Sequence, residues 1–177
     1  MVSLNRSGHF KARMLSALTG ALLLSSAHGA AGATANATMM VSVTVEASCT
    51  VSANPLAFGS YQPGRGPVSG RTTLAVLCSQ GAPFVVALDA GTAGSVAQRV
   101  MTMGTAGLQY NLYTTPAHTT VWGDGTQGSA TVSGTGHGLM SSAAITETVY
   151  GRLLDSPGNA GLAPGLYTDT ITLTITY

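Results

Sequence analysis

The most regular feature of the chain is a stretch near its N-terminus in which apolar and polar side chains alternate. From Ala35 to Cys49, every odd-numbered position is apolar and every even-numbered position except Met40 is polar. Successive side chains of a β-strand point to opposite faces, so the pattern predicts a strand with one buried face. A strand near a free terminus usually frays unless a sheet holds it, and nothing before this one can pair with it. We therefore expect its partner to be another molecule.

Short runs of apolar or alternating residues, separated by glycine and proline, fill the rest of the chain. The stretch 55–59 is expected to place Leu56 and Phe58 in the core, and 62–70 reads as a loop. Segments 118–122 and 129–132 are predicted to pair as a hairpin, because the intervening Asp124-Gly125 pair can supply positive φ angles. The remaining predicted strands are 72–78 (central), 84–88, 100–103 (an edge strand), 108–113, 147–154 and 166–177.

The last predicted strand carries its apolar side chains on one face and threonines on the other. Its apolar positions are Ile171, Leu173, Ile175 and Tyr177. No stretch of ten or more residues shows the apolar period of a helix. Many short strands with glycine and proline between them predict an all-β sandwich.

The first 33 residues have the features of a secretory signal peptide. Arg6, Lys11 and Arg13 precede the apolar run 14–24, and small residues at 27–33 offer cleavage sites. No later segment approaches the roughly 20 apolar residues of a membrane helix. We therefore expect an exported protein without a membrane span.

Removal of this leader changes the charge of the chain. The mature part has four arginines and six acidic residues, which gives a net charge of −2. It has no basic stripe that could displace counterions from phosphates, so nucleic acid is not an expected partner. So few charges suit a protein that packs against copies of itself, and they suit an ordinary extracellular β-protein equally well.

The two cysteines, Cys49 and Cys78, are the only thiols of the chain. In an exported protein they are expected to form a structural disulfide. A metal site would need further ligands, and His118 and His137 do not have ligand spacing.

The residues that could carry enzymatic chemistry are sparse. His118 and His137 could each serve as a base, but no Gly-x-Ser-x-Gly nucleophile motif stands between a strand and a helix. We expect no catalytic site, no metal and no cofactor.

Three other patterns have simple structural explanations. Asp124 could be a calcium ligand, but its loop lacks further acids, so a turn is the better interpretation. Trp122, Tyr110 and Tyr113 could stack on sugars, but aromatic residues at strand spacing more often belong to a core. Asn36–Thr38 matches a glycosylation triplet, which is too short to be informative alone.

Seven short motifs, in this order, resemble the spore coat protein U domain family, which includes the subunits of archaic (Csu-type) chaperone-usher pili. The resemblance covers essentially the whole mature chain. The motifs are Pro55–Gly59, Leu77-Cys78, Ala87–Gly91, Tyr110–Tyr113, Val121–Thr126, Val149–Arg152 and Gly165–Thr170.

The resemblance implies an immunoglobulin-like sandwich that lacks its last strand, so that an apolar groove lies beside the last strand that the chain encodes. In such pili the N-terminal extension of the next subunit fills the groove, a known form of β-strand addition. The resemblance thus makes 34–47 a donor strand, with Met39, Val41, Val43 and Val45 facing the groove. The acceptor-groove strand would carry Ile171, Leu173, Ile175 and Tyr177.

The implied organisation is a signal peptide (1–33), the donor strand (34–47) and a pilin-like domain (48–177). The implied partners are a periplasmic chaperone, an outer-membrane usher and identical or related pilus subunits, with export through the periplasm to the cell surface. The expected function is a structural pilus subunit that supports adhesion or biofilm formation. Two alternatives stay open: a spore-coat or surface-matrix protein of the same fold without a pilus, and a self-contained carbohydrate-binding sandwich.

Overall fold

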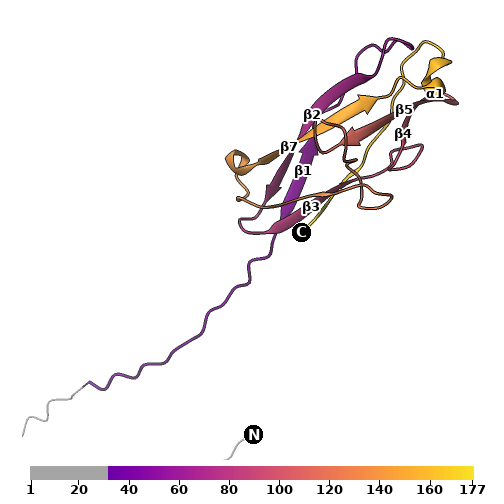
Figure 1. Cartoon of the computed structure of the whole chain (residues 1–177). Coiled ribbons are helices and arrows are strands. Elements are labelled where there is room, and N and C mark those ends of the chain that lie inside the picture. Colours follow the sequence, from indigo (N-terminus) through magenta and orange to yellow (C-terminus); the bar gives the residue numbers. More distant parts are fainter. Residues whose placement is uncertain (1–31) are drawn as a thin grey trace, which may run out of the picture. The chain divides into compact units, whose positions relative to one another are not determined.

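The computed structural model describes residues 32–177 (Figure 1), so the predicted signal peptide lies almost entirely outside the described residues. Residues 32–48 form no helix or strand, and the first strand begins at Cys49. The elements are β1 (Cys49–Ala53), β2 (Val68–Cys78), β3 (Pro83–Leu88), β4 (Arg99–Met103), β5 (Ala106–Tyr113), β6 (Val132–Thr135), the 3₁₀ turn η1 (Ser141–Ala143), β7 (Ile145–Leu153), the one-turn helix α1 (Pro157–Ala160) and β8 (Leu173–Thr176). Within 32–177, no helix has the length and apolarity needed to cross a membrane.

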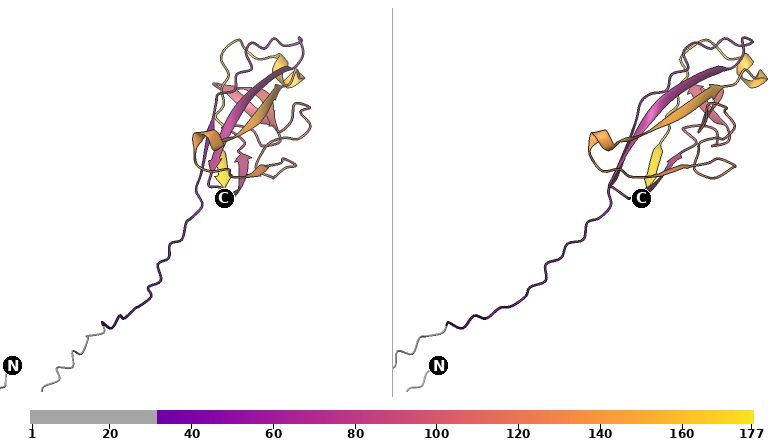
Figure 2. Two further views of the ribbon diagram at one scale, coloured as in Figure 1. Left: turned by 90° about the vertical axis from the view of Figure 1, so that its left-hand side faces the viewer. Right: turned by 60° about the vertical axis from the view of Figure 1, so that its left-hand side comes forward.

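The strands form two sheets in which every pair is antiparallel. One sheet has the order β1-β2-β7-β5-β4, and the other has the order β6-β3-β8. Figure 2 shows β8, at the yellow end of the sequence, beside β3. The all-β prediction is therefore confirmed at the level of two antiparallel sheets.

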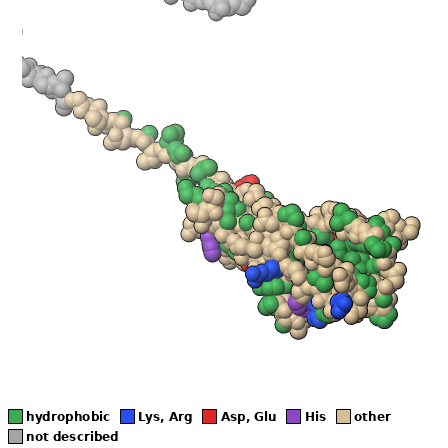
Figure 3. All heavy atoms as spheres, turned by 90° about the horizontal axis from the view of Figure 1, so that it is seen from above, with side chains coloured by type: hydrophobic (Ala, Val, Ile, Leu, Met, Phe, Trp, Pro, Cys, Tyr) green, Lys and Arg blue, Asp and Glu red, His purple; other side chains and the backbone are tan. Residues whose placement is uncertain are grey.

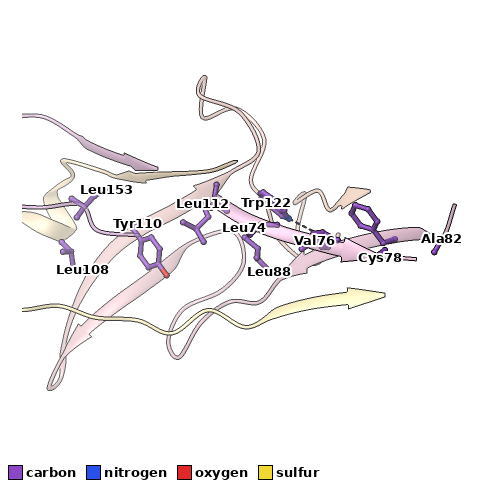
Figure 4. Close-up of a cluster of buried hydrophobic side chains, with 13 residues drawn as sticks. Leu74, Val76, Cys78, Ala82, Leu88, Leu108, Tyr110, Leu112, Trp122 and Leu153 are labelled. Carbon is purple, nitrogen blue, oxygen red and sulfur yellow. Dashed lines mark hydrogen bonds between the residues drawn. The ribbon is translucent and has the colours of Figure 1, made fainter. Parts of the chain in front are cut away.

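The core lies between the two sheets and uses one face of each strand. Alternate residues of β2 and β3 are buried, as their period-two patterns predict. In β5, Leu108, Tyr110 and Leu112 are buried on one face, and Asn111 is buried on the other. The Trp122 indole nitrogen donates a 3.1 Å hydrogen bond to the carbonyl of Val86, which satisfies the only polar atom of this buried side chain. The cluster in Figure 4 consists of Leu74, Val76, Cys78, Ala82, Phe84, Val86, Leu88, Leu108, Tyr110, Leu112, Trp122, Val149 and Leu153.

Five predicted strands are confirmed with small shifts of their ends: 72–78, 84–88, 100–103, 108–113 and 147–154. The largest shift is in β2, which begins at Val68 and so shortens the predicted loop. β2 lies between β1 and β7, and β4 lies at the edge of its sheet, as expected.

Arg99 is a fully buried cation that sequence patterns do not reveal. Its guanidinium donates to the carbonyl oxygens of Leu88, Asp89 and Trp122 at 2.7–3.3 Å, and to the side-chain oxygen of Asn111 at 2.6 Å. Burial lowers the pKa of Arg99. Because these acceptors come from both sheets and from the segment after β5, Arg99 ties the two sheets together.

The predicted hairpin of 118–122 and 129–132 is wrong. In the described chain, 118–122 and 129–131 contribute only isolated bridges, and the bridge between Trp122 and Ala130 is parallel. Val132 instead begins β6, which pairs with β3. The reason is the turn itself: the Asp124 carboxylate accepts hydrogen bonds from the Thr126 amide (2.9 Å) and hydroxyl (2.6 Å). Such an Asx turn closes the loop on itself and does not direct the two arms into an antiparallel ladder.

The predicted strand 166–177 is only partly correct, because just Leu173–Thr176 joins the sheet as β8. Upstream, Thr168 exchanges two backbone hydrogen bonds (2.8 and 3.1 Å) with Thr102 of β4, which belongs to the other sheet. The segment therefore changes from one sheet to the other, although its threonine alternation continues without a break.

Candidate functional site

An apolar groove of about 1110 Å³ opens between the two sheets of the domain. One wall is the segment 53–63, which follows β1, and the other wall is 162–173, which leads into β8. The floor is the apolar face of the sheets, with Leu88, Leu108, Tyr110, Leu112, Val149 and Leu153. Leu56 and Phe58 reach the core from the first wall, as predicted, and Phe58 packs edge-on against Tyr110 with ring centroids 5.9 Å apart.

The first wall is held by one carboxylate. Asp155 accepts hydrogen bonds from the Tyr61 hydroxyl (2.9 Å) and from the amides of Gly64 (3.0 Å) and Gly66 (2.7 Å). The two backbone amides, and then the Tyr61 hydroxyl, lower the pKa of Asp155. Desolvation and the same hydrogen bond raise the pKa of Tyr61. A charged Asp155 thus fixes the 61–66 loop beside the groove.

The second wall is held by Asp169. Its carboxylate accepts hydrogen bonds from the Tyr110 hydroxyl (2.7 Å) and from the Thr92 amide (2.8 Å) and hydroxyl (2.7 Å). Burial, and then the bond to Asp169, strongly raise the pKa of Tyr110, so the phenol stays a hydrogen-bond donor. Gly91 lies so close to Asp169 that a Cβ at this position would overlap the carboxylate.

Asp89 fixes the start of the last strand. Its side chain accepts from the amides of Gly91 (2.9 Å) and Thr172 (3.0 Å), and its own amide donates to the Thr172 carbonyl (3.1 Å). Desolvation alone would raise the pKa of Asp89, but the hydrogen bonds from Thr172 and Gly91 and the Arg99 charge outweigh it, so the pKa lies below its usual value.

β8 pairs with β3 on one side, and within the described residues it has no strand on its other side. Its apolar face is half-buried. Ile171 and Leu173 line the groove, and Ile175 packs against the core from farther along β8. Tyr177 lies beyond the end of β8 and is 56% exposed. Of the residues proposed for the acceptor strand, Ile171 and Leu173 therefore lie in the open part of the groove.

The alternating N-terminal segment exposes both of its faces. On its apolar face, Met39, Val41, Val43 and Val45 are 82–87% exposed. Isolated apolar side chains on a surface are common, whereas a contiguous exposed row of this kind is uncommon. The described structure thus contains two apolar surfaces that lack a partner, the segment and the groove.

The predicted disulfide is confirmed. Cys49 and Cys78 are bonded, and they are paired residues of β1 and β2 in the sheet register. The bond fixes the point at which the N-terminal segment joins the domain. A disulfide of this kind indicates an extracytoplasmic compartment.

The other candidate residues have structural roles or are dispersed. Trp122 and Tyr110 are buried, so neither presents a face to a sugar, while Tyr113 packs edge-on against His118 at 5.1 Å. His118 is half-buried and His137 is exposed on a different loop. In the part of the chain that the structure describes, no group of three potential metal ligands occurs. Figure 3 shows charged side chains only in scattered positions on the face that it presents.

Sequence reasoning missed the two groove walls and their carboxylates. Asp155 and Asp169 are single acids in loops, and no periodic pattern marks them. Two local features of the sequence could have pointed to these carboxylates. Asp169 belongs to the Gly165–Thr170 motif, and Gly64 and Gly66 lie in a loop whose backbone amides need hydrogen-bond acceptors.

The spore coat protein U domain (SCPU) matches residues 35–174, so the chain belongs to this family. Membership in this pilin-like structural family bears out the expectation that the protein is not an enzyme. No curated protein sequence matches the chain.

Among solved structures, the fold is similar to a chain of the CsuC–CsuE chaperone–tip adhesion subunit pre-assembly complex from the archaic chaperone-usher Csu pili of Acinetobacter baumannii. The TM-score is 0.51 at 20% sequence identity. The similarity covers 76% of the present chain and 41% of the matched chain, so the protein corresponds to less than half of its structural relative.

Proposed function

We propose that the protein is a structural subunit of an extracellular chaperone-usher pilus that polymerises by donor-strand complementation. On this proposal the domain is an immunoglobulin-like sandwich that lacks its last strand, 34–47 is the donor strand, and the fibre supports adhesion or biofilm formation. The domain of one copy accepts the N-terminal segment of another.

One observation carries the proposal: an open apolar groove beside the free edge of β8 occurs in the same chain as an exposed alternating segment. The free edge offers unpaired backbone donors and acceptors, and edge strands with this property readily add a further strand. The donor's apolar face has the period that such a strand needs to point side chains into the groove at every second residue.

The energy of the pairing favours assembly. Burial of one Val or Met side chain contributes about 1.5–3 kcal/mol, so the four apolar side chains of the segment contribute about 6–12 kcal/mol before ordering costs. The walls of the groove are already fixed by Asp155 and Asp169, so the ordering cost falls mainly on the incoming segment.

The proposal also requires partners before assembly. A subunit with an unfilled apolar groove would aggregate during export, so we expect a periplasmic chaperone to cover the groove. We further expect an outer-membrane usher to exchange the chaperone for the next subunit. The similarity to a chain of a chaperone-bound pilus complex supports this expectation.

A self-contained sandwich would bury the apolar face of its own first strand. The exposure of Met39, Val41, Val43 and Val45 favours the fibre instead. A coat or matrix protein could use the same pairing without a pilus, and only the form of the assembled product separates these two functions.

The test is deletion of residues 35–45 in the full-length exported chain. We expect wild-type cells to carry thin surface fibres in negative-stain electron microscopy, and the deletion to abolish them while soluble, disulfide-bonded subunit persists in the periplasm. A matched control replaces Ser42 and Thr44 on the polar face with Asn, and it should preserve the fibres. Fibres in the deletion strain would refute donor-strand assembly, and amorphous surface material in the wild type would favour a coat.

A further inference from the structure

Exposed apolar side chains also occur outside the N-terminal segment and outside β8. Leu139 and Met140, which lie between β6 and β7, are 52% and 78% exposed, and Leu166 is 80% exposed. We infer that Leu139 and Met140 of one copy contact Leu166 of the next copy, which forms a second subunit interface beside the donor strand. The inference rests on the proposed function and identifies the partner surface as a second copy of this chain.

Leu139 and Met140 belong to the end of the domain from which the N-terminal segment leaves. Ser79 donates from its backbone amide to the carbonyl of Ser48 at 2.9 Å, and the Gly138 amide donates to the carbonyl of Cys78 at 3.0 Å. The C-terminal end of the segment and the loop that carries Leu139 are thus both hydrogen-bonded to the backbone at the end of β2. We name this region, Ser48, Cys78, Ser79 and 136–140, the disulfide end.

Leu166 belongs to the opposite end. It lies in the second groove wall, and the floor there is formed by Leu108 of β5 and Leu153 of β7. Leu153 pairs with Val68, the first residue of β2, whereas Cys78 is the last residue of β2. Figure 4 shows Cys78 and Ala82 at one end of the core cluster and Leu108 and Leu153 at the other. We name the region of 162–167 the groove end.

The direction of the donor strand decides which ends meet. β8 runs from the groove toward the disulfide end, because Leu173 pairs with Leu88 and Thr176 pairs with Val85 near the start of β3. Every ladder of the domain is antiparallel, so we place the donor antiparallel to β8. Val45 of the donor then lies at the groove end of the acceptor.

The connection between the two domains is short. Only Glu46, Ala47 and Ser48 separate Val45 from the first strand of the donor's own domain. Three residues span at most about 10 Å when fully extended. The disulfide end of the donor copy is therefore held against the groove end of the acceptor copy. Met140 at the first end and Leu166 at the second are the most exposed large apolar side chains of 48–177, and Leu139 lies beside Met140. Because one surface meets a different surface, the contact is heterologous and can repeat from copy to copy along a fibre.

The test is disulfide trapping in assembled fibres of the full-length chain that carries Leu139→Cys together with Leu166→Cys. After mild oxidation and boiling in denaturant without reductant, we expect a ladder of covalent multimers, while each single variant gives at most dimers. The matched control is Arg71→Cys with Leu166→Cys. Arg71 is exposed but lies seven residues along β2 from Cys78, about 23 Å from the disulfide end. This pair should give no ladder.

A second variant tests the same interface in case the double-cysteine protein does not form fibres. Fibres of the Leu139→Ser, Met140→Ser protein should form with normal subunit content, and their persistence length in electron micrographs should fall at least two-fold relative to wild type. Fibres without a ladder, or an unchanged persistence length, would overturn the second interface and leave donor-strand assembly intact. A wild-type chain that forms no fibres at all would instead overturn the proposed function.

Discussion

Replacement of Val43 by Asp places a carboxylate on the apolar face of the proposed donor strand, and it tests the proposed pairing through a single side chain. Val43 is 87% exposed, so the folded domain loses no buried contact when its side chain changes. In the fibre the same side chain would enter the apolar groove of the next copy. The variant therefore separates the stability of the subunit from the stability of the polymer.

The magnitude follows from two contributions. Loss of the buried Val side chain removes about 1.5–3 kcal/mol. An unpaired polar group in an apolar site costs a further few kcal/mol, about 1–3 on protein scales and more for a charge. The described lining residues include no arginine or lysine that could pair with the new charge. We expect a loss of about 3–6 kcal/mol per subunit contact, which corresponds to a factor of about 10²–10⁴ in the association constant.

The assay compares the variant Val43→Asp with the variant Thr44→Asp, which carries the same charge one residue away on the polar face. Both subunits should reach the periplasm with the disulfide intact and melt within about 2 °C of wild type, because surface substitutions usually change stability by less than about 0.5 kcal/mol. Only Val43→Asp should lose fibres. An unfolded Val43→Asp subunit would show that this face belongs to the subunit's own core, and normal fibres would show that the face is not buried in the polymer.

Three further predictions concern the domain itself, each measured by urea denaturation of the purified subunit. Replacement of Cys49 and Cys78 by Ser opens a link between residues separated by 29 positions and should cost about 3–4 kcal/mol on the chain-entropy account. Arg99→Met should cost at least about 2 kcal/mol, because it leaves buried carbonyl oxygens without a donor, whereas a change below about 0.5 kcal/mol would mean that water replaces the guanidinium. The pKa values of Asp89 and Asp155 lie below the unfolded value of about 3.9, so their contribution is complete above that pH and is lost as the pH falls below about 4. Stability should therefore decline on acidification below about pH 4, with a shallower slope in Asp155→Asn.

The alternation of apolar and polar residues was sufficient to predict most of the core, but it was not sufficient to predict the last strand. Leu74, Val76 and Cys78 of β2 are buried because alternation in a strand specifies which residues share a face. Alternation does not specify the strand's partner. Between Leu166 and Tyr177 the same pattern continues while the chain moves from β4 to β3, so a local reading assigns one long strand where the structure has a bridge and a short strand.

The incorrect hairpin prediction for 118–122 and 129–132 has a related cause, because a local pattern is compatible with two structures. Asp124-Gly125 is compatible with a hairpin and with an Asx turn, and the choice depends on whether Thr126 and Ser129 supply local donors. The Thr126 hydroxyl and amide bind Asp124, and the Ser129 hydroxyl donates to the Thr126 carbonyl at 2.7 Å. These short-range bonds close the loop before a ladder can form, which no dipeptide rule captures.

The groove raises a physical question that the sequence does not pose: why an apolar cavity of about 1110 Å³ stays open in a folded domain. Apolar walls alone would close over the floor, since collapse would bury surface. Here each wall is instead bound by a carboxylate with several donors, Asp155 to the Gly64 and Gly66 amides and Asp169 to Tyr110 and Thr92. Movement of either wall into the groove would break charge-assisted hydrogen bonds, each of which contributes about 1.5–3 kcal/mol. The polar anchors of the two walls therefore keep an apolar site open between them, and on the proposed function the incoming donor strand meets a site that is already formed.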